Sequence, residues 1–550
     1  MVAGEEWNMD RPWYAFYDRN VPRTIAYPNL TLKELFNRNA ENNPDKPYLI
    51  FKDLALPYGV CNAMARRLAN GLLKLGVRKG DRVALMMPNI PQYPISLMAC
   101  YKIGAIAVPA NPLYSVPELS HQFRDSGSET VIVMAPFADK VIQILNEGST
   151  QIKRIIAVQM PGSGIELEGV PALLDFDRLL GKSDDHEPDI AIASEDVAIL
   201  QYTGGTTGLP KGCMLTHANL VAMLEQTGAW CSEGRPGGQC RTLAAIPLYH
   251  VYGMNCNINM TLYCAGTMVL VAQPTSDNIL EAINRHEPTM WAAVPAMIQG
   301  LLHHPHLGES KVKGIKLILC GGAPLAVEVM KRFEAISGTQ IWEGYGLSET
   351  SNVVTANPKP LRKPGSVGVP WPDVDIRIVD LEAATKEMPP GEPGEIIAKG
   401  PQIMTGYWNN PEETARSLKE GWLYTGDIGY MDRDGYLFLL DRKKDMVLCS
   451  GFNVYPREID EVLYTNPKIA EACVIGVPDE KRGETVKAYL VLKPGETLTA
   501  KEITDYCKER LAPYKVPKIV EFIEQLPRTM VGKPDRKTLR AIDEAKRKQI

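Results

Sequence analysis

The sequence has no uninterrupted apolar run of the length that crosses a membrane, which takes about 20 residues. Its most apolar stretch, residues 95–110, is broken by Lys102. The first twenty residues are polar and aromatic and contain no apolar core of a secretory signal. We therefore expect no stable membrane insertion, and at most transient contact with a membrane surface.

An excess of positive charge is also absent, because the formal net charge is −5 over 550 residues. Proteins dedicated to nucleic acids are usually basic, so we expect no nucleic-acid partner. None of the 11 cysteines belongs to a CxxC pair. Their odd number and their scatter from Cys61 to Cys507 indicate reduced, buried thiols in a cytoplasmic protein, and they argue against a disulfide framework.

The chain is long enough for two or more domains of roughly 150 residues each. Strand-like and helix-like stretches alternate along most of it. We expect strands at 82–87, 105–109, 130–134, 155–158, 197–202 and 317–319, and a helix at 91–101. This alternation predicts an α/β protein in which helices cover the sheets.

The last part of the chain has a different organisation. Turn-forming residues at 381–394 indicate a surface loop. Beyond it we expect strands at 436–440, 446–448, 472–477, 486–492 and 519–523, and helices at 457–464, 500–510 and 538–548. These elements predict a small α+β unit. Because the charged DRKK run at 441–444 marks its start, we divide the chain into domains 1–440 and 441–550.

The segment YTGGTTGLPKG, residues 202–212, follows an apolar strand-like run. Glycines let a backbone approach an anion, threonine hydroxyls donate to phosphate oxygens, and Lys211 adds a positive charge. Pro210 before this lysine and Gly212 after it exclude a Walker P-loop, which ends in Gly-Lys-Ser/Thr. Taken alone, the segment is equally compatible with an ordinary surface loop.

Six blocks, in the same order, resemble the adenylate-forming superfamily of acyl-CoA synthetases, luciferases and peptide-synthetase adenylation domains. After YTGGTTGLPKG come PLYHVYG from Pro247, EGYGLSET from Glu343, YTGD from Tyr424, DRKKDMVLCSGFNVYPREID from Asp441 and LPRTMVGKPDRKTL from Leu526. The blocks GDRVALMMPNIPQYP, LYHVYGMN and EGYGLSET are most similar to medium- and long-chain fatty acid CoA ligases.

The resemblance implies an α/β fold with a large N-terminal region of two β/α subdomains plus a β-barrel-like subdomain. A small, mobile α+β C-terminal domain would follow. It also implies an ATP-dependent acyl-CoA ligase that converts a carboxylic acid to acyl-AMP and then to acyl-CoA, releasing AMP and pyrophosphate. ATP, Mg²⁺, coenzyme A and a medium- or long-chain fatty acid would be its small-molecule partners.

Three alternatives stay open. They are a non-CoA acceptor for the acyl group, an aromatic or polar acid as substrate, and a non-catalytic binding protein on the same fold. The sequence contains no indication of the oligomeric state.

The resemblance assigns three catalytic residues. Lys533 would bridge the carboxylate and the phosphate, Glu349 would hold Mg²⁺ together with Thr206, and His250 would gate the acid pocket. Removing one such stabilising group typically costs roughly 10²–10³ in rate. The nucleotide and coenzyme A contacts are assigned to Thr203, Gly205, Thr206, Thr207, Lys211, Gly322, Ala323, Pro324, Glu343, Gly344, Tyr345, Gly346, Ser348, Asp427, Arg442, Lys444 and Gly451.

Four of these residues have a specific expected role. By the resemblance, Tyr345 would lie against the adenine face, and Asp427 would accept hydrogen bonds from ribose hydroxyls with help from Arg442. Lys444 falls at the hinge position of the C-terminal domain. Without the resemblance, core packing would explain Tyr345 and a turn would explain Asp427.

Two unusual runs lie outside these assignments. If MNCNINM, residues 254–260, is a helix, Asn255 and Asn259 share one face and point away from the acid. Should Asn257 line the acid pocket instead, a substrate with a polar group becomes plausible. The cluster of His303, His304 and His306 lacks a recognisable metal-site spacing. We expect it to be a solvated helix end without acidic partners.

Overall fold

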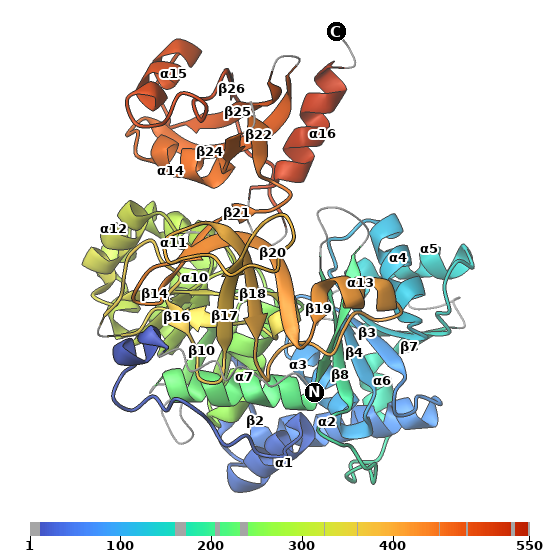
Figure 1. Ribbon diagram of the computed structural model, residues 1–550. Coiled ribbons are helices and arrows are strands. Elements are labelled where there is room, and N and C mark those ends of the chain that lie inside the picture. The colour runs from blue at the N-terminus through green and yellow to red at the C-terminus, as the bar shows by residue number, and fades with distance from the viewer. Residues whose placement is uncertain are drawn as a thin grey trace, which may run out of the picture.

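The computed structural model describes residues 11–159, 172–203, 210–231, 240–323, 325–359, 361–449, 452–479, 482–529 and 534–547. Four sheets lie within these residues (Figure 1). Two are mainly parallel and belong to the large N-terminal part, a third is antiparallel, and the fourth lies in the small C-terminal unit.

The first sheet has seven strands in the order β7-β6-β5-β3-β4-β8-β9. Neighbours are parallel except β8 and β9, which pair antiparallel. The strands are β3 (Arg82–Met86), β4 (Ile106–Pro109), β5 (Thr130–Met134), β6 (Arg154–Val158), β7 (Leu173–Asp175), β8 (Val197–Thr203) and β9 (Lys211–Thr216). Crossover helices join the parallel strands, as this geometry requires. They include α3 (Gln92–Ile103), α4 (Val116–Ser126) and α5 (Ala138–Asn146).

The second sheet has nine strands in the order β16-β15-β14-β13-β12-β10-β11-β1-β2. Its strands are β1 (Pro47–Phe51), β2 (Leu54–Pro57), β10 (Arg241–Ala244), β11 (Thr267–Leu270), β12 (Met290–Ala293), β13 (Leu317–Cys320), β14 (Ile341–Tyr345), β15 (Thr355–Ala356) and β16 (Val369–Pro370). Helices α10 (Ser276–His286), α11 (Pro295–Leu302) and α12 (Val327–Ser337) follow its parallel strands. Helix α1 (Leu32–Asn42) precedes β1, and α2 (Tyr58–Lys74) follows β2 and leads to β3 of the first sheet.

Two helices of the main core are buried on nearly every side. In α3 all positions from Tyr93 to Ile103 are buried, and α7 (His217–Trp230) is buried at eleven positions. A mainly apolar helix belongs in a protein interior, and α3 has such a composition. In α7 the buried positions also include the polar residues His217, Asn219, Gln226 and Thr227. The exception in α3 is Lys102, whose fully buried ammonium lies 2.7 Å from Glu187 Oε2.

The third sheet is antiparallel and corresponds to the predicted barrel-like piece. Its order is β17-β18-β20-β19, and β21 pairs with β20. The strands are β17 (Asp375–Val379), β18 (Gly394–Lys399), β19 (Leu418–Lys419), β20 (Trp422–Met431) and β21 (Leu437–Arg442). The short helix α13 (Pro411–Ser417) precedes β19. Residues 381–394, predicted to be a loop, link β17 to β18.

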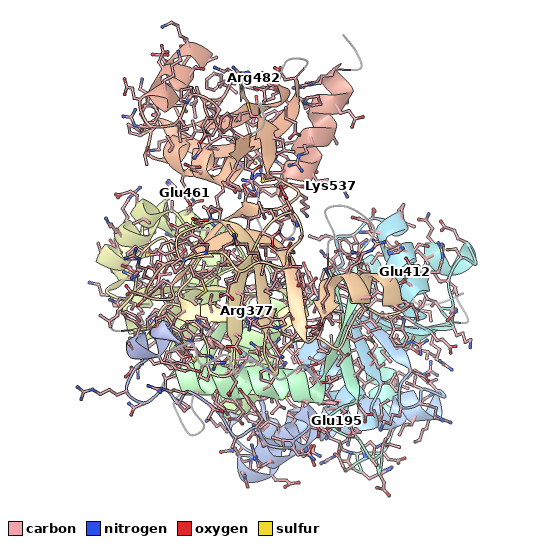
Figure 2. All side chains as sticks on the ribbon, viewed as in Figure 1. Glu195, Arg377, Glu412, Glu461, Arg482 and Lys537 are labelled. Carbon is pink, nitrogen blue, oxygen red and sulfur yellow. The ribbon has the colours of Figure 1, made fainter. Side chains whose placement is uncertain are left out.

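The C-terminal unit has its own sheet and its own apolar core. The strands are β22 (Val447–Cys449), β23 (Phe452–Val454), β24 (Ile469–Asp479), β25 (Gly483–Leu492) and β26 (Ile519–Phe522), and the helices are α14 (Pro456–Tyr464), α15 (Ala500–Lys508) and α16 (Arg536–Arg547). Figure 1 shows this unit standing clear of the rest. In Figure 2, Glu461 of α14 and Lys537 of α16 lie at its edge toward the large part.

One carboxylate holds the start of this unit together. Asp441, at the end of β21, has a side chain that is 1% exposed. Its Oδ1 accepts from the backbone N–H of Arg442 at 2.8 Å and from Arg536 at 3.4 Å. Its Oδ2 accepts from the N–H of Arg457 at 2.9 Å, which ties in the first turn of α14.

The predicted fold class is confirmed: the protein is α/β, with a large N-terminal part and a smaller C-terminal domain. The third sheet ends at Arg442 and the fourth begins at Val447. The domain boundary after residue 440 and the mobility of the small domain stay predictions.

Candidate active site

The Gly- and Thr-rich segment joins the two strands of an antiparallel hairpin. Strand β8 ends at Thr203 and β9 begins at Lys211, and these two residues are register partners. The predicted contacts Gly205, Thr206 and Thr207 lie between them, outside the described residues. The hairpin therefore brings Thr203 and Lys211 to one edge of the first sheet, where both line a large cavity.

The side chains around Glu349 form a connected polar group. Lys211 Nζ lies 2.5 Å from Glu413 Oε1, and its ammonium is 5.5 Å from the ring centre of Tyr407. The Tyr407 hydroxyl donates to Glu349 Oε1 at 2.8 Å. In addition, the N–H of Met404 donates to the Glu349 carbonyl at 2.8 Å. The neutral Tyr407 hydroxyl thus holds the Glu349 carboxylate at the cavity wall.

A tight turn presents Glu349. Strand β14 ends at Tyr345, and a short 3₁₀ helix, η7 (Ser348–Thr350), follows. The turn is so close to the returning chain that a Cβ on Gly346 would lie 1.5 Å from the Asn352 carbonyl oxygen. Only glycine fits there, which explains the Tyr-Gly-Leu-Ser-Glu spacing in physical terms.

Tyr345, Asp427 and Arg442 form a second cluster. The Tyr345 hydroxyl donates to Asp427 Oδ2 at 2.7 Å, and Arg442 Nε lies 2.9 Å from Asp427 Oδ1. Strands β20 and β21 place Asp427 and Arg442 as register partners. The negative charge of Asp427 raises the pKa of Arg442 above its ordinary value. The Asp427 side chain is only 9% exposed, whereas that of Arg442 is 42% exposed.

Two lysines follow Arg442 in the linker. Lys443 Nζ lies 2.9 Å from Glu395 Oε2, so it is paired with β18. Burial, reinforced by the Arg442 charge, lowers the pKa of Lys444 to about 8. Both lysines line the large cavity.

The apolar side of the cavity is formed around His250. His250 caps the short helix α8 (Val251–Gly253), and its Nδ1 accepts from the N–H of Tyr252 at 3.2 Å. The chain continues as a π-helix, η4 (Met254–Asn259), and then as α9 (Met260–Tyr263). The Tyr252 hydroxyl donates to the Leu319 carbonyl at 2.9 Å, which fixes its ring against β13.

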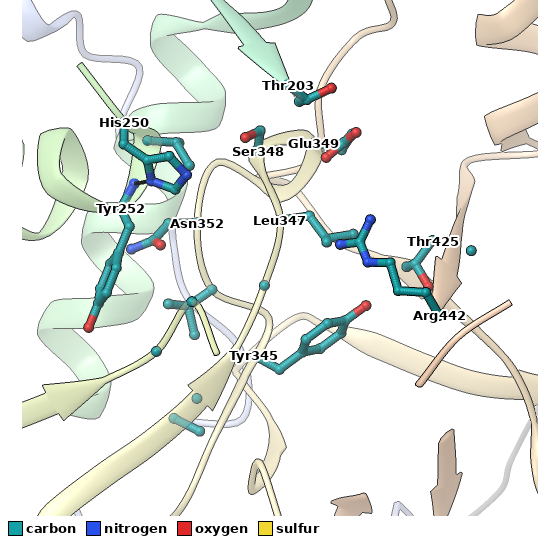
Figure 3. A pocket seen from close by; sticks show the side chains of 18 of the residues that line it. Thr203, His250, Tyr252, Tyr345, Leu347, Ser348, Glu349, Asn352, Thr425 and Arg442 are labelled. Carbon is teal, nitrogen blue, oxygen red and sulfur yellow. Dashed lines mark hydrogen bonds between the residues drawn. The ribbon is translucent and has the colours of Figure 1, made fainter. Parts of the chain in front are cut away.

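One cavity of about 600 Å³ joins these groups, a size typical of ligand pockets (Figure 3). Figure 3 shows His250, Tyr252 and Asn352 on one side and Thr203, Ser348 and Glu349 on another, with Tyr345 and Arg442 beside them. The predicted residues that line it are Thr203, Lys211, His250, Gly322, Gly344, Tyr345, Gly346, Ser348, Glu349, Arg442 and Lys444.

Three predicted residues are described but do not line this cavity. Asp427 is buried and bonded to Tyr345 and Arg442, while its neighbours Thr425 and Gly426 line the cavity. Glu343 is 7% exposed, and burial raises its carboxyl pKa to about 7. Ala323 follows β13 next to Gly322. Pro324, Gly451 and Lys533 lie outside the described residues, so their assigned roles stay predictions.

Sequence reasoning missed several charged and aromatic groups of the cavity. Glu413, Tyr407 and Glu395 line it and bind Lys211, Glu349 and Lys443 respectively. None of the three belongs to a recognised block, and Glu413 is 202 positions from Lys211 in the sequence. These three contacts join segments that are distant in the sequence, so no local sequence pattern could predict them.

The two unusual runs give different outcomes. Asn259 Nδ2 donates to Asn255 Oδ1 at 2.6 Å, so these two share a face as a helix predicts. The expectation that the histidines lack acidic partners is wrong. His304 Nε2 lies 2.9 Å from Asp277 of α10, and His306 Nδ1 lies 3.3 Å from Glu309, three residues further along the chain.

Neither a membrane span nor a preformed metal cage was found within the described residues. No helix there is long and apolar enough to cross a bilayer. Likewise, no group of three or more His, Cys, Asp or Glu side chains there could hold a metal ion.

Comparison with known proteins identifies the family to which the chain belongs. Residues 36–408 match the AMP-binding enzyme family, and residues 458–533 match the AMP-binding enzyme C-terminal domain. A long-chain-fatty-acid–CoA ligase of Bacillus subtilis is 41% identical, over 96% of this chain and 97% of that protein. A ligase of the same description from Yersinia pestis is 37% identical, over 97% and 98%.

A solved structure agrees with these matches. The ATP-bound crystal structure of MatB from Rhodopseudomonas palustris superposes with a TM-score of 0.84, at 31% identity, covering 93% of this chain and 99% of that one. The resemblance drawn from the sequence blocks is therefore confirmed. The chain belongs to the AMP-binding enzyme family, within the adenylate-forming superfamily and close to the fatty acid CoA ligases.

Proposed function

We propose that this protein is an ATP-dependent acyl-CoA ligase for a medium- or long-chain fatty acid, releasing AMP and pyrophosphate. The observation that carries the proposal is the joining, in one cavity, of the Tyr345–Arg442 cluster, the Glu349 carboxylate and the apolar wall of Tyr252. The Tyr345–Arg442 cluster would bind the nucleotide, the Glu349 carboxylate a metal ion, and the apolar wall the hydrocarbon chain. The names of the two curated ligases support the class of acid.

The nucleoside would be held by the cluster around Asp427. An ionised carboxylate has about four acceptor positions. Tyr345 and Arg442 occupy one on each oxygen, which leaves about two for the ribose hydroxyls. The Tyr345 ring and the backbone of Gly321 and Gly322 line the cavity, and they would enclose the adenine.

The phosphates would be held from the opposite wall. Thr203, Lys211 and Ser348 line the cavity there, and the family pattern adds Thr206 and Thr207. Mg²⁺ often uses one or two carboxylates together with substrate phosphates. Glu349 fits this role, because its carboxylate lies at the cavity wall and, among the described residues, accepts a hydrogen bond from the neutral Tyr407 hydroxyl. Bound Mg²⁺ would neutralise phosphate charge.

The first step joins the acid to AMP. The carboxylate oxygen attacks the α-phosphorus, and the bond to pyrophosphate breaks. Lys533 would lie between carboxylate and phosphate and stabilise the negative charge in the transition state. His250 lines the cavity where the carboxylate would enter, between the polar wall and the pocket of Tyr252.

The second step transfers the acyl group to coenzyme A. The thiol sulfur attacks the acyl carbon, the thiol loses its proton, and AMP leaves. We propose that the small domain turns about Lys444 between the steps, which withdraws Lys533 and brings Gly451 toward the tunnel for coenzyme A. Lys444 lines the cavity at the junction of the two parts, as a hinge residue would.

A cytoplasmic location and only transient contact with membrane surfaces complete the proposal. All 11 cysteines are free thiols, which agrees with a reducing compartment.

A panel assay tests the proposal. Purified protein would receive ATP, Mg²⁺, CoA and one acid from acetate to palmitate, or benzoate, and AMP and thioester would be quantified together. We expect AMP matched by acyl-CoA, with the highest kcat/KM for a medium or long chain. AMP without thioester would point to another acceptor, and silence with every acid would contradict the ligase.

A variant separates catalysis from binding. Lys533→Ala should lower adenylation by roughly 10²–10³ while ATP affinity stays within a few fold. Lys537→Ala is the matched control, because Lys537 is an exposed lysine on α16 (Figure 2) and should have wild-type activity. Equal activity of Lys533→Ala and wild type would refute the assigned role.

A further inference from the structure

A second, smaller cavity lies behind the apolar wall of the main one. It has a volume of about 10 Å³, which is room for about one water molecule. It is enclosed by η4 and by strands β10, β12 and β13. Cys256 and Leu319 line both cavities, so a single layer of side chains separates the small cavity from the pocket proposed for the acid.

Asn257 makes this cavity unusual. The residue lines it and is 0% exposed. Both Nδ2 and Oδ1 of its side chain are buried without a hydrogen-bond partner in the described part of the chain. Buried amides are nearly always paired, because the loss of water must be compensated. An amide with both ends unpaired beside a cavity therefore indicates a guest that both donates and accepts.

The neighbours of Asn257 underline the contrast. Asn255 and Asn259, on the other face of the same helix, bond to each other, and Asn255 also donates to the Ser351 carbonyl. Those contacts fix the π-helix. Asn257 takes no part in them, so its amide has no structural task that the described contacts reveal.

The remaining lining limits the chemistry of the guest. Met290, Leu317 and Leu319 are apolar, and the Thr242 hydroxyl is already bonded to Thr261 at 2.8 Å. Trp291 also lines the cavity, and its Nε1 is a further buried donor without a hydrogen-bond partner among the described residues. No charged residue lines the small cavity. A second carboxylate or an ammonium would be buried there without a counter-charge, which is strongly unfavourable. An uncharged oxygen group fits. A hydroxyl fits best, because it accepts from Nδ2–H and donates to Oδ1 at once.

We propose that Asn257 is a specificity-determining residue for hydroxylated acids. The substrate class is a hydroxy fatty acid whose hydroxyl lies far from the carboxylate. Its tail passes between Cys256 and Leu319, and the hydroxyl replaces a single water in the small cavity and bonds to the Asn257 amide. This inference rests on the proposed acyl-CoA ligase function and names the acid for the same site.

The preference for a hydroxy acid arises because an acid without a hydroxyl cannot form hydrogen bonds with the Asn257 amide. A terminal methyl group in the same place displaces water and leaves the amide unpaired. A hydroxyl reproduces the water's hydrogen bonds, so its entry is favourable. Sites built to bond a substrate hydroxyl discriminate strongly against the analogue that lacks it. We expect a preference of about tenfold or more at the chain length that reaches the cavity.

The test uses matched pairs of acids from eight to sixteen carbons, each plain and ω-hydroxylated. Two readouts are taken on the full chain: direct calorimetric binding of each acid, and kcat/KM for thioester formation. Wild type should bind and use the hydroxy acid about tenfold better than its plain partner at one chain length. The chain length at which the preference appears would show how far Asn257 lies from the bound carboxylate.

Asn257→Leu provides the decisive comparison. It keeps the volume and removes both polar atoms, so it should lose the hydroxy preference while plain acids keep their rate within about threefold. Asn257→Ser replaces the amide by a hydroxyl, which can both donate and accept, so it should keep part of the preference. It also serves as the second variant if Asn257→Leu folds poorly, which thermal unfolding would reveal.

The outcomes separate this inference from the ligase proposal. Equal binding of plain and hydroxy acids by wild type at every length would overturn it and assign Asn257 to a trapped water. A hydroxy preference that survives in Asn257→Leu would overturn it as well. A binding preference lost in Asn257→Leu, without thioester from any acid, would support this inference and refute the acyl-CoA ligase.

Discussion

Replacement of Asp427 by asparagine tests the nucleotide site most directly. The change keeps the shape of the side chain and removes its charge. In the structure, two of the roughly four acceptor positions of the carboxylate are taken by Tyr345 and Arg442, and about two remain for ribose hydroxyls. A hydrogen bond to a charged group contributes about 1.5–3 kcal/mol, against about 1 kcal/mol for a neutral one.

The binding free energy lost in Asp427→Asn therefore amounts to about 0.5–2 kcal/mol for each ribose hydrogen bond, or about 1–4 kcal/mol for two. Part of the Arg442 pairing is lost as well, but that side chain is 42% exposed, so solvent screens the effect. We expect the KM for ATP to rise about tenfold or more, with a smaller change in kcat.

Steady-state kinetics with varied ATP at saturating acid and CoA would measure this change. The matched control is Asp434→Asn, which removes a carboxylate from the same hairpin where it pairs with Lys363 outside the cavity. It should leave the KM for ATP unchanged. An unaltered KM in Asp427→Asn, or an equal rise in both variants, would refute the assignment of Asp427 to ribose.

Three further changes test other parts of the site and the core. Glu349→Gln should raise the Mg²⁺ concentration for half-maximal rate about tenfold, read from a magnesium titration, because a neutral amide is a weaker ligand. Gly346→Ala should lower stability by about 1–3 kcal/mol in thermal unfolding, since its Cβ meets the Asn352 carbonyl, whereas Gly308→Ala, with open space around it, should not. Burial lowers the pKa of Lys102 to about 8, so the unfolded chain binds more protons above that pH. The free energy of unfolding of wild type, relative to Lys102→Met, should rise from about pH 8 to about pH 10.5 in urea titrations; a flat difference would contradict this.

Most of the fold was predictable because its strands are short apolar runs between clear breaks. Strand β5, Thr130–Met134, agrees with its predicted bounds, and the three C-terminal helices lie within two residues of theirs. The turn at Gly346 was predictable too, because the EGYGLSET block contains the glycine that the close approach of the Asn352 carbonyl requires. Here local chemistry and tertiary structure agree.

What could not be predicted depends on contacts between distant segments. The segment around α13 supplies Glu413 to Lys211 of the first sheet and Tyr407 to Glu349, which follows β14 of the second sheet. The acidic partner of His304 comes from another helix. The π-helix at Met254–Asn259 also left no signal, since its sequence fits an α-helix equally well. Its hydrogen-bonding pattern determines where Asn257 lies.

The carboxylate of Asp441 bears on the speed of any domain rotation. Two of its partners, the N–H of Arg457 and the Arg536 guanidinium, belong to the C-terminal unit, while Asp441 itself ends a strand of the large part. The proposed turn of the backbone at Lys444 would move those partners away from the buried Asp441 carboxylate. The proposed rotation would therefore have an activation barrier that includes breaking these bonds, and we expect the two orientations to exchange as discrete states instead of drifting continuously between them.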